Sequence, residues 1–155
     1  MRLTKRTNIS MRVLMYCAVN TDRMVVKGEI AEACNISENH LAQVINRLAH
    51  LGFLQTQRGR NGGMTLGRPA GSIRVGDVFR ATESEVPITE CFADEGNTCP
   101  LVSACRLRDV IGRAVEAFYA ALDEVTLSDL ICDNAPLAEL MSPVACSRSC
   151  VASVA

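Results

Sequence analysis

The sequence predicts a mainly α-helical fold in which a helix-turn-helix is followed by a short β-hairpin. Three observations lead to this fold class: two helical segments joined by a tight turn near residue 36, two short strands joined by a glycine-rich turn near residue 60, and a long amphipathic helix over 102–125. A hairpin directly after a helix-turn-helix is a wing. The predicted organisation is a winged-helix domain over 1–82, a cysteine-bearing loop over 83–106, a long helix and a short terminal helix over 107–140, and a loose tail over 141–155.

The composition is that of a folded, soluble, cytoplasmic protein. Hydrophobic residues make up 48% of the 155 residues, and no apolar run approaches the roughly 20 residues that span a bilayer. We find no signal peptide, so we expect no membrane association and reduced thiols. The eight cysteines are too few for a disulfide scaffold.

Charge is distributed unevenly along the chain. Residues 1–80 carry 12 Lys/Arg and 5 Asp/Glu, whereas residues 81–155 carry 4 and 12, so the net charge of −1 hides two opposite halves. This asymmetry favours a nucleic-acid-facing N-terminal half. A solvated basic face would give the same count, so charge alone leaves both interpretations open.

The first predicted helix has an apolar stripe of Ile9, Val13 and Cys17, with Leu14 and Ala18 beside it. Cys17 on this stripe is expected to be a small core residue. A second, short helix over 26–34 should turn Ile30, Ala33 and Cys34 inward, and a turn over 35–37 follows it. Ser37 is the expected N-cap of a longer helix with a buried face of Leu41, Val44, Ile45, Leu48 and Leu51.

The opposite face of this longer helix carries hydrogen-bonding side chains with little charge. They are Asn39, His40, Gln43, Asn46 and Arg47, the residue types that a helix reading base edges requires. His40 taken alone could be a solvated surface histidine. Its position in this row makes base recognition an equal alternative.

The hairpin is predicted from two strands over 53–58 and 64–66, joined by a turn over 59–63 in which Asn61 and Gly62 supply positive φ. Its tip carries Arg58 and Arg60 beside glycines. Such a tip is thin enough to enter a minor groove while the arginines meet phosphates.

Beyond the wing, Ser72 begins a helical segment containing Val75, Val78, Phe79 and Thr82, and Pro87 breaks the chain. The long helix over 102–125 has a stripe of Ile111, Val115, Phe118, Leu122 and Val125. A lone helix of this length must bury its stripe, and a partner subunit or the monomer itself could cover it. Thr126, with Asp129 three residues later, should cap one more short helix.

Three cysteines, Cys91, Cys99 and Cys105, lie in a polar, turn-forming stretch with no apolar period. A thiolate-bound metal would hold such a loop in place. The spacing is neither the paired C-x-x-C of a zinc site nor the run of a bacterial ferredoxin. Soft thiolates in an irregular loop favour an iron–sulfur cluster with a fourth ligand from elsewhere. Three reduced surface cysteines are the alternative.

These residues resemble a known family, the winged-helix repressors that carry an iron–sulfur cluster and that include the IscR and NsrR types. The resemblance covers residues 1 to about 140. It is carried by MRLT at 1–4, SENHL at 37–41, RGRNGG at 58–63, DVFR at 77–80 and CPLVSACRL at 99–107. The NHL sequence at 39–41 and the wing are more similar to the NsrR type, which senses nitric oxide.

The resemblance implies that Cys91, Cys99 and Cys105 bind a two-iron or a four-iron cluster. IscR-type members have a histidine three residues after the third cysteine, where this chain has Arg108. Some NsrR-type members have an acidic residue near the start of the first helix that reaches the cluster of the other subunit, and Asn8 stands here. Asn8 is therefore the candidate fourth ligand, with another acidic group, a small thiol or water as alternatives.

The resemblance further implies a homodimeric repressor that binds an inverted repeat in double-stranded DNA and is released when nitric oxide nitrosylates the cluster. A regulator of the same fold that senses cluster supply or redox state, and a cluster-free winged helix that binds zinc, are the alternatives. An enzyme is not expected, because no nucleophile–base constellation is present. The predicted DNA contacts are Arg2, Lys5, Arg12, Lys27, Ser37, Asn39, His40, Gln43, Arg47, Arg58, Arg60, Asn61 and Gly62.

Overall fold

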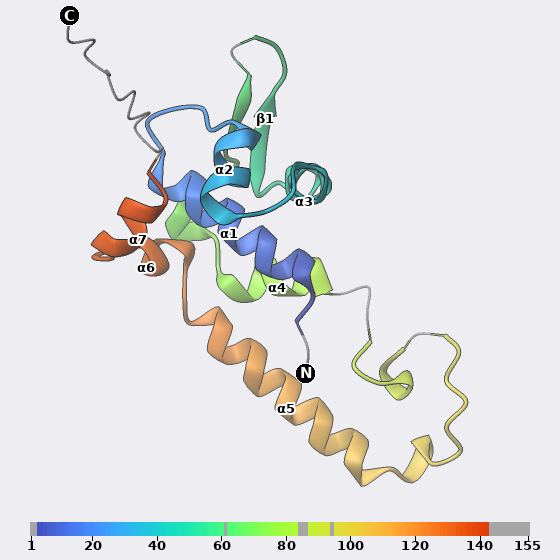
Figure 1. The fold of residues 1–155 in the computed structure, drawn as a ribbon. Coiled ribbons are helices and arrows are strands. Elements are labelled where there is room, and N and C mark those ends of the chain that lie inside the picture. Colours follow the sequence, from blue (N-terminus) through green and yellow to red (C-terminus); the bar gives the residue numbers. More distant parts are fainter. Residues whose placement is uncertain (1–2, 61, 84–86, 94, 143–155) are drawn as a thin grey trace, which may run out of the picture.

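A computed structural model describes residues 3–60, 62–83, 87–93 and 95–142 of the chain (Figure 1). It confirms the predicted class, a mainly α-helical fold with a winged helix-turn-helix. The elements of the winged helix are α1 (Lys5–Val19), α2 (Lys27–Cys34), α3 (Glu38–His50), β1 (Leu54–Gln57), β2 (Gly63–Leu66) and α4 (Val75–Glu83). The chain continues into α5 (Arg106–Asp123), α6 (Leu127–Ile131) and α7 (Ala135–Leu140), with single 3₁₀ turns at Ala70–Ser72 (η1), Glu90–Phe92 (η2) and Val102–Ala104 (η3).

Helix α1 is the centre of the core. It packs against α3, α4, α6 and β2. Of its predicted stripe, Val13, Leu14, Cys17 and Ala18 are buried and Ile9 is half-buried. Burial raises the pKa of the Cys17 thiol to about 12, which agrees with a core residue that takes no part in thiol chemistry. Tyr16, which the stripe did not include, is also fully buried, so α1 is enclosed on more sides than its apolar period indicated.

The turn between α2 and α3 depends on a left-handed residue. Asn35 adopts φ 51°, and its backbone N–H closes the end of α2. Ile30 is buried as predicted, but Ala33 is exposed because only one face of this short helix meets the core. Ser37 occupies the predicted N-cap position, yet its hydroxyl makes no cap bond and instead lies 3.4 Å from His40 Nδ1.

The wing is an antiparallel pair in which Leu54 lies opposite Leu66 and Gln57 opposite Gly63. Two bonds between Val25 and Met64, of 2.9 and 2.8 Å, join it to the segment before α2. Gly59 has a positive φ (117°), whereas Gly62, for which the sequence predicted one, does not; Asn61, the other predicted residue, lies outside the described residues. Gly62 is needed for another reason, because a Cβ there would lie 2.3 Å from the Gln57 carbonyl oxygen.

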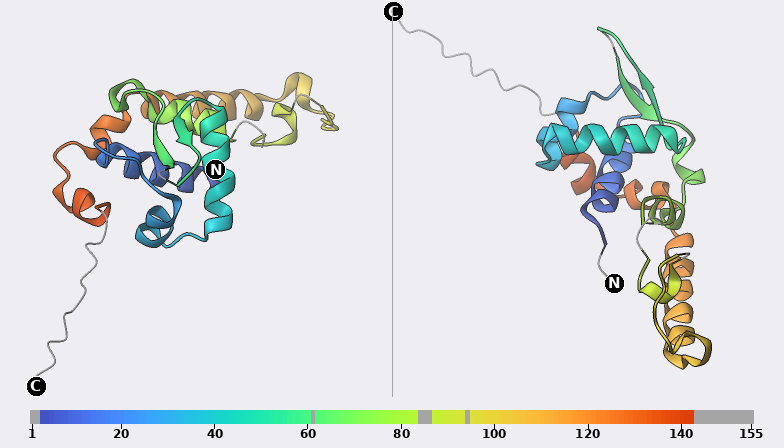
Figure 2. Two further views of the ribbon diagram at one scale, coloured as in Figure 1. Left: turned by 90° about the horizontal axis from the view of Figure 1, so that it is seen from above. Right: turned by 90° about the vertical axis from the view of Figure 1, so that its right-hand side faces the viewer.

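Helices α4 and α5 both start later than the sequence pattern suggested. The η1 turn takes up Ser72, and η3 takes up the first residues of the predicted long helix. Cys105 then has an extended backbone (ψ 99°), so α5 can begin only at Arg106. None of the 18 residues of α5 is buried, and Figures 1 and 2 show the cysteine loop and the start of α5 projecting beyond the rest of the molecule.

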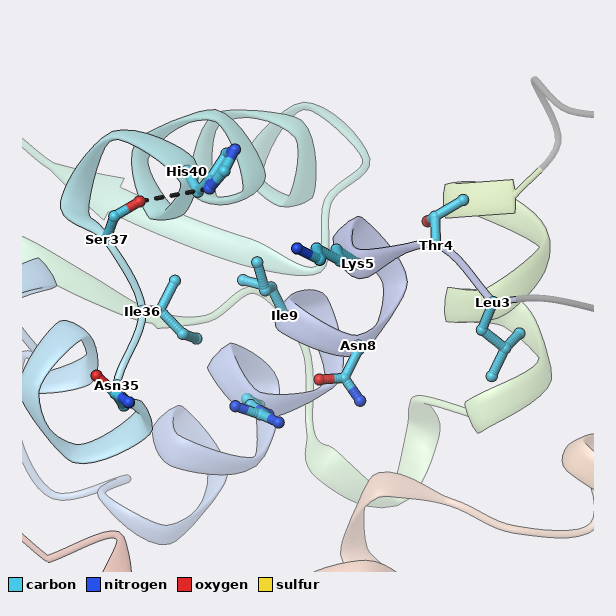
Figure 3. A pocket seen from close by; sticks show the side chains of 10 residues that line it. Leu3, Thr4, Lys5, Asn8, Ile9, Asn35, Ile36, Ser37 and His40 are labelled. Atoms are coloured by element: carbon cyan, nitrogen blue, oxygen red, sulfur yellow. Dashed lines mark hydrogen bonds between the residues drawn. The ribbon is translucent and has the colours of Figure 1, made fainter.

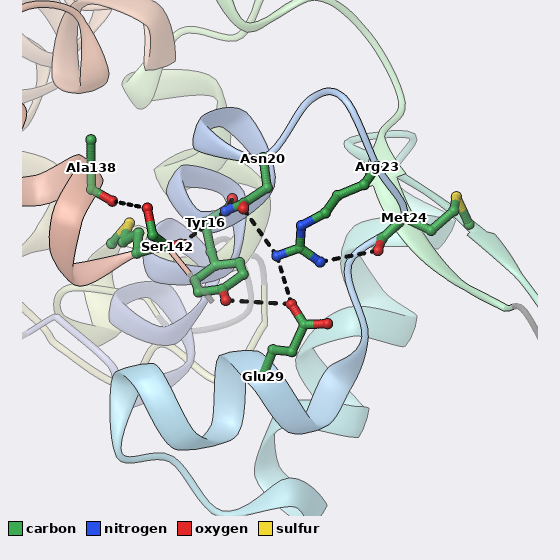
Figure 4. Close-up of polar contacts among 8 residues, drawn as sticks. Tyr16, Asn20, Arg23, Met24, Glu29, Ala138 and Ser142 are labelled. Atoms are coloured by element: carbon green, nitrogen blue, oxygen red, sulfur yellow. Dashed lines mark hydrogen bonds and ion pairs between the residues drawn. The ribbon is translucent and has the colours of Figure 1, made fainter. Parts of the chain in front are cut away.

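The C-terminal part returns to α1. The capping box of Thr126 and Asp129 forms as predicted. Helix α7 was not predicted, although Asn134 accepts a bond from Leu137 N (3.2 Å) as an ordinary N-cap. Met141, assigned to the tail, is buried, and its carbonyl accepts a 2.9 Å bond from Asn20 beside the Tyr16–Arg23–Glu29 contacts of Figure 4. The tail cysteines Cys146 and Cys150 lie outside the described residues.

No helix in the described ranges is long and apolar enough to cross a membrane.

Candidate nucleic-acid interface and cysteine loop

Helix α3 presents one polar face to solvent. Asn39, His40, Gln43 and Asn46 are exposed, as the sequence predicted for a helix that reads base edges. The opposite face holds the helix in place, because Leu41 and Leu48 are fully buried and Val44 and Ile45 nearly so. The exposed polar face of α3 is therefore held in place by the packing of its opposite face.

An open groove of about 530 Å³ runs between the start of α1 and the start of α3. We call it the α1/α3 groove; its lining residues are Leu3, Thr4, Lys5, Asn8, Ile9, Arg12, Asn35, Ile36, Ser37 and His40. Figure 3 shows Lys5 and Ile9 of α1 facing Ser37 and His40 at the first turn of α3. Two cations, a histidine and the positive end of α3 make this groove suited to a phosphate group.

Several predicted DNA contacts are held by neighbours within the chain. Arg12 Nη1 donates to the Cys34 carbonyl (3.2 Å), and Lys27 forms a 2.8 Å ion pair with Glu38. Arg47 is half-buried and its Nη2 lies 3.5 Å from the Ala81 carbonyl of α4, so it contributes to holding α3 against α4. The sequence did not show this inward contact, because helical spacing gives a residue's face but not the reach of its side chain.

The wing carries its two arginines into solvent. Arg58 and Arg60 are exposed, and Gly62 is half-buried at the turn. Arg2 and Asn61, the remaining predicted contacts, lie outside the described residues. An exposed polar helix face, a groove lined by cations and a wing with exposed arginines are features that suit a DNA-binding surface.

The three loop cysteines are half-buried free thiols. Cys91 Sγ lies 3.0 Å from Thr89 Oγ1, and the Cys99 N–H donates to Asn97 Oδ1 (3.1 Å). Within the part of the chain that the structure describes, no three His, Cys, Asp or Glu side chains lie close enough together to hold a metal ion. As a donor set, three thiols without a disulfide fit an iron–sulfur cluster. For all three to meet one cluster, the loop must change its conformation.

Arg108 attaches the loop to α5. Its Nε donates to the Cys91 carbonyl (3.0 Å), and its guanidinium lies 5.4 Å from the centre of the Phe92 ring. The sequence identifies Arg108 only as the residue at the position of a family histidine. Its structural contact could not be read from spacing, because it joins residues 17 positions apart across an irregular loop.

A half-buried polar cluster joins the start of α1 to the end of α4, and we call it the Glu83 cluster. Glu83 Oε1 accepts bonds from Thr4 N (2.9 Å), Thr4 Oγ1 (3.0 Å) and Thr7 Oγ1, and Thr7 Oγ1 lies 2.9 Å from Thr82 Oγ1. Burial raises the pKa of the Glu83 carboxyl, but the hydrogen bonds from Thr7 and Thr4 outweigh it, so the pKa lies below its ordinary value. The Glu83 cluster lies at the C-terminal end of α4, where the chain continues into the cysteine loop.

Asn8 is exposed on α1 and lines the α1/α3 groove. Figure 3 shows its amide on the other side of Ile9 from His40. The predicted fourth ligand thus lies on the helix that also carries Lys5 and Arg12, two of the predicted DNA contacts.

These features together define a winged-helix DNA-binding protein with a cysteine-bearing insertion between α4 and α5. The family model Rrf2, described as an iron-dependent transcriptional regulator, matches residues 3–133, and the chain belongs to this family of DNA-binding regulators.

Curated relatives agree with this placement, and solved structures share the fold. The chain is 42% identical over 142 residues to the HTH-type transcriptional regulator NsrR of Geobacillus kaustophilus, covering 91% of this chain and 97% of that protein. It is 41% identical over 143 residues to NsrR of Bacillus licheniformis, covering 92% of this chain and 100% of that protein. Among solved structures, IscR of T. potens has a TM-score of 0.66 at 22% identity over 84% of this chain and 86% of the other. CymR, the global cysteine regulator of B. subtilis, has a TM-score of 0.66 at 24% identity over 84% of this chain and 96% of the other.

Proposed function

We propose that this DNA-binding regulator is a homodimeric repressor that senses nitric oxide through an iron–sulfur cluster held by Cys91, Cys99 and Cys105. One observation carries the proposal: three free, half-buried thiols occupy the loop that leads from the winged helix into α5. The name NsrR of the relatives supports it, because over 90% of this chain aligns with each of them.

The dimer is proposed from the exposure of α5. Leu107 is 65% exposed, Val110 50%, and Leu101 just before the helix 66%. Large apolar side chains grouped on one projecting helix are typical of an interface with another subunit. A dimer in which each subunit presents one α3 would read an inverted repeat, so we propose a second copy of this chain as the partner.

The chain's own residues suggest how the signal reaches DNA. The cluster would supply the iron to which nitric oxide binds. The three thiols would be drawn together when they hold it, and the loop would be ordered between the Glu83 cluster at one end and Arg108 at the other. Loss of that order changes the connection between α4 and α5 and with it the fit of two α3 helices to one operator.

The DNA contacts proposed for this function are the exposed side chains of α3, the α1/α3 groove and the wing. His40 and Gln43 would meet base edges, while Lys5, Arg58 and Arg60 would meet phosphates. Asn8 is proposed as the fourth ligand, which would reach the cluster of the other subunit.

The test is to purify the chain without oxygen and to measure iron, sulfide and zinc content together with the visible spectrum. Binding to duplex DNA selected from a random pool is then measured before and after addition of nitric oxide. We expect iron and sulfide, an inverted repeat among the selected sequences, and loss of binding after nitric oxide. Zinc without sulfide would contradict the cluster. A cluster-bearing protein that releases DNA with oxidant but not with nitric oxide would contradict the signal.

A further inference from the structure

Helix α5 is fastened to the winged helix at its C-terminal end by a compact set of contacts with α4. Arg80 donates two bonds to the Asp123 carboxylate, Nη1 to Oδ1 at 2.7 Å and Nη2 to Oδ2 at 2.6 Å. The same guanidinium lies 4.6 Å from the centre of the Tyr119 ring. A bidentate, stacked arginine fixes the direction of its partner as well as the distance to it. We call Gly76, Arg80, Tyr119 and Asp123 the α4–α5 joint.

Gly76 makes this close approach possible. A Cβ at position 76 would lie 1.9 Å from Asp123 Oδ1 and 3.1 Å from Arg80 Nη1, so no larger residue leaves the ion pair where it is. The end of α5 is also tied through the backbone. Val75 N donates to the Val125 carbonyl (2.9 Å), and Leu127 N donates to the Ile73 carbonyl (2.8 Å). The C-terminal end of α5 is therefore fixed, whereas its N-terminal end projects with exposed Leu107 and Val110.

A helix fixed at one end acts as a lever. The 18 residues of α5 are about 27 Å long, so a tilt of about 10° at the joint moves the far end by about 5 Å. One base pair adds about 3.4 Å along the DNA and turns one half-site against the other by about 34–36°. Small changes in the joint are thus comparable to one base pair of spacer.

We propose that the α4–α5 joint sets the operator spacing, with Arg80 and Asp123 as positioning residues that determine which spacer length between half-sites the dimer accepts. This rests on the proposed function, because it requires two copies joined through α5 on an inverted repeat. The residues touch no DNA in this role. They act by holding the angle between the helix that dimerises and the domain that reads the bases. Arg80 also lowers the pKa of the Asp123 carboxyl, so the pair remains charged at neutral pH.

The experiment uses the full-length chain purified without oxygen and an inverted repeat selected by the wild-type protein from a random duplex pool. Spacers are then lengthened or shortened by one and two base pairs, and Kd is measured by fluorescence anisotropy. Wild type should prefer its own spacer about tenfold over the neighbouring lengths, since twisting DNA to restore the fit costs free energy. Asp123→Asn and Gly76→Ala should reduce this preference at least about threefold or move the optimum by one base pair, by the same deformation argument. Both should bind a single half-site as wild type does.

Glu124→Gln and Gly71→Ala are the matched controls. Glu124 is the exposed acidic neighbour of Asp123, and a Cβ at Gly71 would meet nothing within 4 Å. Both controls should keep the wild-type spacer preference. If Asp123→Asn also keeps it, the joint does not set the spacing, and this single result overturns the inference even if Gly76→Ala fails to fold. If wild type itself selects no inverted repeat, the dimeric function fails together with the joint.

Discussion

The chain consists of two regions built from the same kind of amphipathic helix but packed in opposite ways. The body, residues 3–83 and 127–142, contains every fully or nearly fully buried side chain that the structure describes. The arm, residues 87–126, contains none among its described residues, although α5 is the longest helix of the chain. An apolar stripe therefore predicts that a helix face will be buried. It does not predict whether the residues that bury it belong to the same chain or to a partner subunit.

Polar contacts differ between the regions in the same way. In the body the Glu83 cluster is partly shielded from solvent and joins residues far apart in sequence. In the arm the cysteine loop is held by exposed bonds, among them Arg108 to the Cys91 carbonyl and Thr98 to Glu90. Single hydrogen bonds contribute only about 0.5–1.5 kcal/mol each, so a bound ligand can change the arm while the body stays intact.

The largest effect that separates the two regions is expected at the loop cysteines. Cys91→Ser, Cys99→Ser or Cys105→Ser should each remove the iron from anaerobically purified protein, because a serine oxygen is a poor substitute for a thiolate on iron–sulfur clusters. Circular dichroism should show an unchanged helix content. Cys132→Ser, an exposed thiol outside the loop, is the control and should keep full iron content. Full iron in any of the three loop variants would refute the ligand assignment.

One substitution in each region should distinguish burial within the monomer from burial in the proposed dimer interface. Leu48→Ala in the body should lower the free energy of unfolding by about 2–5 kcal/mol, since Leu48 is fully buried. Leu107→Ala in the arm should leave the stability of the monomer nearly unchanged and weaken the dimer. Urea unfolding and sedimentation equilibrium measure the two quantities. Equal losses of monomer stability would show that the N-terminal half of α5 packs within its own chain.

Recognition of the half-site sequence, as distinct from the spacing, should depend on the body alone. His40→Ala and Gln43→Ala should reduce discrimination between the selected operator and random DNA by about 1–3 kcal/mol, because base-edge bonds carry the sequence information. Arg58→Ala should weaken binding to both DNAs alike and lower the salt dependence. Iron content should be unchanged in all three variants. The α3 assignment is wrong if Arg58→Ala changes discrimination as much as His40→Ala does.

The smallest effect is a pH dependence at the boundary between the regions. The folded-state pKa of Glu83 lies below its ordinary value of about 4.3, so the ionised form stabilises the fold. This contribution is complete above the unfolded-state pKa and disappears as the pH falls through the lower folded-state pKa. Glu83→Gln should therefore be less stable than wild type at pH 7 and equal to it near the lowest pH at which both still fold. Urea unfolding at a series of pH values measures this difference, and a constant difference at all pH values would contradict it.

The sequence by itself determined the order and type of the main elements. Hydrophobic period located α1, α3 and the interior of α5, and the residues themselves predicted the Thr126–Asp129 capping box and the exposed row from Asn39 to Asn46. These features are local, because capping and helical faces depend on residues three or four positions apart. The cysteine loop was visible for the same reason, since a polar stretch without period cannot form a core.

Only the tertiary structure decided the contacts between distant residues. Thr4 and Glu83 meet 79 positions apart, Arg80 and Asp123 43 apart, and Asn20 and Met141 121 apart. Nothing in the pattern around Gly76 showed that it must lie against Asp123. The physical reason is that the local sequence pattern specifies which face of a helix is buried. The partner of each side chain depends instead on how whole helices pack, and this packing is determined by all the apolar surfaces together.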